Sequence, residues 1–151
     1  MERPSPEFLT SLNNELALAI GNAVWAFAKI EWAVTSALGR AGNELDHILA
    51  EFPLKQRTTV LRKLLPELAV PKDVQVRVAT SLTSIESLST RRNLIAHNPW
   101  MVWMDLDARE IMTEIQHYAR PERKLDLSSL SEFTEECQRV LDEFEAAVVA
   151  L

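Results

Sequence analysis

The chain has 151 residues, a length that fits one domain, and we expect a single domain over residues 1–151. Apolar residues make up 47% and charged residues 25%, which excludes a mostly disordered protein. The formal net charge of −6 argues against a protein that coats nucleic acid without specificity, because such binding depends on neutralised phosphates. One cysteine and 3 histidines exclude an internal disulfide and make a poor zinc set, so we expect no metal and no cofactor.

The N-terminus shows no signal-peptide pattern, since Met1, Glu2, Arg3 and Pro4 are followed by Ser, Pro and Glu. The longest uncharged run, residues 16–28, has 13 residues and is too short to span a bilayer. We therefore expect a cytoplasmic protein with no membrane contact.

Charge is distributed unevenly along the chain. Residues 52–92 carry 8 basic and 3 acidic side chains, whereas residues 1–51 carry 3 and 7 and residues 93–151 carry 5 and 12. The basic middle segment could present a positive surface to an anion. Its charges could equally be paired with the acidic segments on either side, and the sequence leaves both readings open.

The first predicted helix begins at Ser5–Pro6, where an N-cap residue precedes a proline at the first helical position. Trp25 and Trp32 share a side of this helix away from its main apolar stripe, and Gly21 indicates the close approach of another backbone. A helix that is apolar on so many faces is buried centrally or packs against a partner. The helix ends at the two glycines of residues 39–42, and its main stripe consists of Leu16, Ile20, Val24, Phe27, Val34 and Leu38.

Three more helical segments follow in chain order. A short helix over residues 44–51 is broken by a proline, and a leucine-lined helix follows over residues 54–68, with a proline in its last turn. After Pro71, apolar residues at helical spacing predict another long helix. This helix stops close to His97, because Pro99 disfavours helical backbone at the residue before it.

The period of the apolar residues changes after this helix. Residues 101–106 and 110–118 flank Asp107–Ala108, and their side chains alternate as in strands. The pattern favours a short two-stranded hairpin, although a helix over residues 107–118 also fits.

The last predicted helix follows a polar loop over residues 119–128. Ser129 and Glu132 form a capping box at its start, and its apolar face continues to Leu151. The predicted architecture is all-α: an antiparallel four- to five-helix bundle with a possible short β-hairpin before the last helix.

Polar side chains gather at the end of the long helix that follows Pro71. Asn93 and His97 are four residues apart and share a face, whereas Arg92 falls in the apolar sector of the helix. Glu31 lies in the apolar stripe of the first helix. A buried charge is costly unless it is paired, so we expect Glu31 to pair with Arg91 or Arg92. A structural ion pair with a hydrogen-bonded histidine would satisfy these residues without any catalysis.

The pattern Arg92-Asn93-x-x-x-His97 resembles the Arg-x4-His motif of the HEPN superfamily. The order of elements is also similar: a long first helix with an internal glutamate, the motif at the end of a later helix, and a final amphipathic helix. The resemblance implies a small helical bundle that forms a homodimer. Many such proteins are metal-independent endoribonucleases, often toxins or antiphage effectors neutralised by an antitoxin, while others are non-catalytic.

Metal-free RNA cleavage needs a proton carrier and a positive charge at the phosphate. His97 can carry the proton, and Arg92 can hold the scissile phosphate, while Asn93 can orient either partner. A second copy of the chain would supply a second His97. The basic residues that could extend the RNA path are Lys55, Arg57, Arg62, Lys63 and Arg91.

Two other functions fit the sequence. The first is a non-catalytic HEPN-like dimer that binds a nucleotide or a protein partner. The second is an adaptor bundle whose tryptophan-rich first helix recruits another protein.

Overall fold

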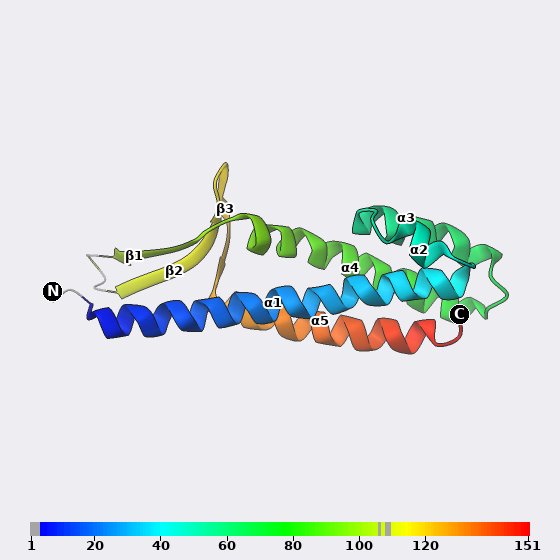
Figure 1. The fold of residues 1–151 in the computed structure, drawn as a ribbon, viewed down its shortest axis with the longest axis horizontal. Helices are drawn as coiled ribbons and strands as arrows, with labels where there is room; N and C mark the ends of the chain where they lie inside the picture. Colours follow the sequence, from blue (N-terminus) through cyan, green and yellow to red (C-terminus); the bar gives the residue numbers. More distant parts are fainter. Residues whose placement is uncertain (1–3, 106, 108–109) are drawn as a thin grey trace.

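The computed structural model describes residues 4–105, 107 and 110–151. Helix α1 (Pro6–Ala41) runs along the whole molecule (Figure 1). Helix α4 (Lys72–His97) runs in the opposite direction, and α5 (Leu127–Val148) runs in the same direction as α1 (Figure 1). Side-chain contacts fix this parallel pairing, because Lys29 bonds to Gln138 and Arg40 bonds to the carbonyl oxygen of Val148. The expected fully antiparallel bundle is therefore wrong for α1 and α5.

The core lies where these three long helices meet. The rings of Phe27 and Phe133 stack with their centroids 6.3 Å apart. Small residues on α1 let its neighbours approach closely, and the buried alanines are Ala23, Ala26, Ala33 and Ala37. Trp25 and Trp32, by contrast, are exposed, as the sequence pattern predicts for a face outside the main stripe.

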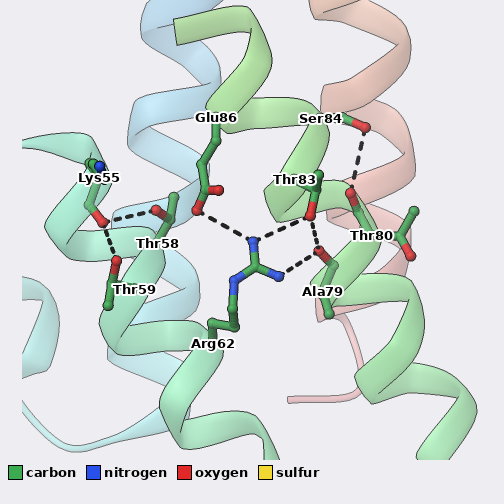
Figure 2. A network of polar contacts seen from close by, with 9 residues as sticks. All are labelled: Lys55, Thr58, Thr59, Arg62, Ala79, Thr80, Thr83, Ser84 and Glu86. Atoms are coloured by element: carbon green, nitrogen blue, oxygen red, sulfur yellow. Dashed lines mark hydrogen bonds and ion pairs between the residues drawn. The ribbon is translucent and has the colours of Figure 1, made fainter.

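Two shorter helices connect α1 to α4. They are α2 (Leu45–Leu49) and α3 (Leu54–Leu64), and a 3-10 turn, η1 (Leu65–Glu67), follows α3. The proline in η1 has no backbone N–H to continue the α-helical ladder, so α3 ends earlier than residue 68. Arg62 of α3 bonds to α4 through the carbonyl oxygen of Ala79, the hydroxyl of Thr83 and the carboxylate of Glu86 (Figure 2).

Between α4 and α5, the chain forms a three-stranded antiparallel sheet. Its strands are β1 (Trp100–Asp105), β2 (Glu110–His117) and β3 (Arg120–Asp126), in that order. Strands β1 and β2 form the predicted hairpin, with Trp100 opposite Ile115. Leu106 and Ala108, which the prediction places at the strand end and in the turn, lie outside the described residues. The all-α prediction is wrong, because five helices in the described part of the chain are accompanied by this sheet.

Strand β3 replaces the polar loop expected over residues 119–128. Every residue of β3 except Leu125 is exposed. The sequence of β3 therefore lacks the alternation of apolar and polar residues that indicates a half-buried strand. Pro121 is tolerated there because β3 is an edge strand.

The start of α5 also differs from the prediction. Asp126 is the N-cap, and its carboxylate accepts a hydrogen bond from the backbone N–H of Ser129 at 2.7 Å. This bond lowers the pKa of the Asp126 carboxyl. The expected capping box of Ser129 and Glu132 therefore lies inside the helix and not at its first residue.

Helix α1 is long and apolar enough to cross a membrane when judged by length and composition alone. The 13-residue uncharged run therefore understates the apolar length of this helix. In the structure, 33% of its most apolar 18-residue window is buried against the rest of the chain. The mostly buried core helix of a soluble protein and a signal sequence near the N-terminus both pass the same test of length and composition.

Cys137 lies on the buried face of α5. Burial raises the pKa of its thiol to about 12, and the neighbouring Glu136 adds to this rise. The folded state therefore holds the proton more tightly than the unfolded chain does. The free energy of unfolding should fall as pH rises from about 8.5, where an ordinary thiol ionises, towards 12.

This difference predicts that iodoacetamide will alkylate Cys137 much more slowly in the folded protein than in urea at about pH 8. Mass spectrometry of timed samples measures both rates. Cys137→Ala should show a shallower loss of stability at alkaline pH than the wild type. Equal alkylation rates in the folded and unfolded chain would contradict the burial of this thiol.

Candidate active site at the end of helix α4

Glu31, in the C-terminal third of α1, joins three helices. Its carboxylate oxygen Oε1 accepts a hydrogen bond from Nη2 of Arg92 at 2.6 Å, so the pairing expected with Arg91 or Arg92 is present for Arg92. The same oxygen lies 4.0 Å from Nη2 of Arg57 on α3. Glu31 thus ties α3 and α4 to the apolar face of α1, and its side chain is 28% exposed.

Glu31, Arg57 and Arg92 form one cluster, and Arg57 is the residue of this cluster whose position differs from the prediction. Its side chain is not on a solvated RNA path, because Arg57 is only 9% exposed. Its Nη1 donates to the carbonyl oxygen of Glu31 at 3.1 Å and to the hydroxyl of Thr35 at 2.6 Å. The spacing of Leu54, Arg57 and Leu61 places all three on one helical face, and this signal was available in the sequence.

Arg91 and Arg92, which are adjacent on α4, contact different neighbouring helices. Arg92 places its guanidinium carbon 5.2 Å from the centre of the Phe27 ring on α1. Arg91 does the same over Phe133 on α5, also at 5.2 Å, and forms an ion pair with Glu136. Each guanidinium is therefore held between a core aromatic ring and a carboxylate. These contacts fix the rotation of α4 about its own axis.

Asn93 and His97 lie on another side of α4. They line a pocket of about 640 Å³, together with Arg91, at the junction of α4 with strands β2 and β3. Arg92 does not line this pocket. Five residues along a helix correspond to a rotation of about 140°, which turns Arg92 towards α1 and His97 towards the sheet. The structure brings Asn93 and His97 together, as their spacing predicts, and separates Arg92 from both.

His97 occupies the last turn of α4. The helix ends at Asn98, whose side-chain amide donates to the carbonyl oxygen of Leu94 at 2.9 Å, and Pro99 prevents its continuation. The side chains of Asn93 and His97 are exposed and make no hydrogen bond within the described part of the chain. Both are therefore available to a ligand in the pocket.

Lys55 and Arg62, the other predicted substrate-binding residues, lie away from this pocket. Lys55 is exposed on α3 and lines a separate groove beside Phe52. Arg62 is held between α3 and α4 by the contacts in Figure 2. Arg91 and Arg92 pair with Glu136 and Glu31, which belong to the flanking acidic segments, whereas Arg62 pairs with Glu86 inside the basic segment itself.

Within the described residues, no group of three or more His, Cys, Asp or Glu side chains is placed to hold a metal ion. In comparisons with known proteins, no family model, no curated protein and no solved structure matches the chain. The function is therefore inferred from the residues of the site itself.

Removing the carboxylate of Glu31 should leave Arg57 and Arg92 without their counter-ion. We expect Glu31→Gln to lower the free energy of unfolding by about 2–3 kcal/mol, as measured by chemical denaturation. Glu143→Gln is the matched control, because Glu143 pairs with Arg139 at 2.8 Å on the exposed side of α5. Glu143→Gln should lower the free energy of unfolding by less than about 0.5 kcal/mol. Equal effects of the two substitutions would show that the ion pairs of Glu31 stabilise the fold no more than an exposed ion pair does.

Proposed function

We propose that the chain is a metal-independent endoribonuclease of the HEPN type, in which His97 transfers a proton. The observation that supports this most is the pocket, where His97 and Asn93 are free polar side chains beside several basic residues. An imidazole can accept and donate a proton near neutral pH. The proposal places the protein in the cytoplasm. It also treats α1 as a core helix of the fold.

The proposed reaction uses the RNA's own 2′-hydroxyl as the nucleophile. The 2′-oxygen attacks the adjacent phosphorus and loses its proton to a base, while the bond to the 5′-oxygen breaks and that oxygen takes up a proton. The product end is a 2′,3′-cyclic phosphate. His97 supplies one proton carrier, and Asn93, on the same helical face, orients His97 or the phosphate.

Arg92 has a different role in this proposal from the one that the motif implies. Its guanidinium bonds to Glu31 and covers Phe27, so in the single chain it positions α4 and does not face the pocket. The same observation favours the second candidate function, a non-catalytic dimer that binds a nucleotide or a protein partner. RNA that is bound but not cut would identify the nucleotide-binding form of that alternative.

Cleavage should persist in EDTA and should fall by at least about 100-fold in His97→Ala, because one proton carrier is lost. His47→Ala is the matched control, since His47 is an exposed histidine on α2, outside the pocket. It should cut mixed RNA at the wild-type rate, and mass spectrometry should find cyclic phosphate ends. A requirement for magnesium, or full activity in His97→Ala, would remove the catalytic assignment.

A second copy of the chain is the partner that the outer face of α1 fits. Leu18, Trp25 and Trp32 follow one another at intervals of seven residues and are 66%, 71% and 71% exposed. Gly21 lies among them, and a Cβ there would meet no atom within 4 Å in the described chain. A glycine inside a helix lowers the stability of the helix by about 1 kcal/mol relative to alanine. The close approach of another helix, which the small size of Gly21 permits, would offset this loss. Large and small residues alternating at this period suit helix-on-helix pairing.

We expect light scattering at micromolar concentration to give twice the chain mass of 17.1 kDa. Trp25→Glu and Trp32→Glu should give monomers, because a charge would be buried in the interface. Val76→Glu is the control, since Val76 is an exposed apolar residue on α4. Wild-type protein that stays monomeric at high concentration would contradict this interface.

A further inference from the structure

The pocket beside His97 has a second wall formed by the sheet, and part of that wall is β3, for which the sequence predicted a loop. Strand β2 contributes His117, and β3 contributes Arg123, Lys124 and Leu125. The volume of about 640 Å³ is much larger than a free phosphate ion needs, and it falls in the range of pockets that hold small organic ligands. Leu94 and Leu125 add apolar surface to an otherwise polar lining.

The basic residues of this pocket differ in their availability. Arg91 is engaged by Glu136. Lys124 lies 3.0 Å from the carboxylate of Glu114, a side chain that is itself buried. Arg123 has no ion-pair partner among the residues that the structure describes. Arg123 is therefore the cation best able to bind an anion in the pocket, although the carboxylate of Glu122 also lines it.

A backbone hydrogen bond fixes the tautomer of the neutral His117 ring. Its Nδ1 accepts a hydrogen bond from the backbone N–H of Ala119 at 3.1 Å. The proton of the neutral imidazole therefore lies on Nε2, which is a donor for an anionic oxygen. The register of β2 against β3 shifts between Gln116 and His117, and such bulges re-aim side chains beside functional sites.

We propose that this pocket holds one nucleotide of a single-stranded RNA, with Arg123 and His117 on its phosphate and His97 facing it from α4. The proposal rests on the ribonuclease function and completes it, because Arg92 is turned towards Glu31 and cannot serve as the cation of the pocket. A guanidinium and an imidazole N–H can bind two phosphate oxygens at once. The phosphate-holding residues thus come from the sheet, and the proton carrier comes from the helix.

Binding can be measured without cleavage by using a short, fluorescently labelled 2′-O-methyl RNA, which lacks the nucleophilic hydroxyl. In fluorescence anisotropy, Arg123→Gln should weaken binding by at least about tenfold, because a charge-assisted contact is lost. His117→Phe keeps the ring and removes the donor, so it should weaken binding by about threefold or more. Arg120→Gln is the matched control, since it removes the same charge from the same strand outside the pocket.

Weakening by Arg120→Gln that equals the effect of Arg123→Gln would overturn the proposal, because diffuse charge on the hairpin would then explain binding. Competition provides a second test. A nucleoside 3′-monophosphate should displace the RNA at concentrations where inorganic phosphate does not, and equal displacement by both would reduce the pocket to a simple anion site and overturn the nucleotide assignment.

The result also separates this proposal from the ribonuclease function. If the 2′-O-methyl RNA binds through Arg123 while unmodified RNA stays intact, the nucleotide pocket stands and the ribonuclease function fails. If Arg123→Gln cuts unmodified RNA at the wild-type rate, the ribonuclease function stands and the role of Arg123 is overturned.

Discussion

The carboxylate of Glu31 is the constraint on which the arrangement of the helices depends. It lies on the apolar face of α1, where an unpaired charge would be strongly unfavourable. Arg92 from α4 bonds to this carboxylate directly. Arg57 from α3 lies 4.0 Å from it and bonds to the main chain of Glu31 and to Thr35, so two other helices meet α1 at the same place. The rotation of α4 follows from this contact, and with it the direction in which the opposite face of α4 points.

This rotation divides the Arg-x4-His pattern between two environments. Arg92 belongs to the interior, where it bonds to Glu31 and covers an aromatic ring. Asn93 and His97 belong to a pocket whose other wall is the sheet. A motif that reads as one unit in the sequence therefore does two things in the structure: its arginine anchors the helix, and its amide and imidazole remain free for a ligand.

Much of the helical framework could be predicted from the sequence, because apolar periodicity and prolines mark helices and their ends. The pairing of Glu31 with Arg92 was predictable as well, since two charges on apolar faces need each other. Strand β3 was not, because its exposed residues show no alternation, and without the strand the wall that carries Arg123 could not be foreseen. The parallel direction of α1 and α5 depends on contacts between residues far apart in sequence, such as Lys29 and Gln138.

The central claim is that Arg92 anchors α4 while His97 does the chemistry. The most direct test is the RNA cleavage rate of the double variant Glu31→Gln/Arg92→Gln, corrected for the fraction of folded protein. This variant removes the charge of the pair but keeps side chains that can hydrogen-bond across the two helices. The account predicts a rate of the same order as the wild-type rate. A folded double variant that is as inactive as His97→Ala would contradict it, because Arg92 would then act on the substrate itself.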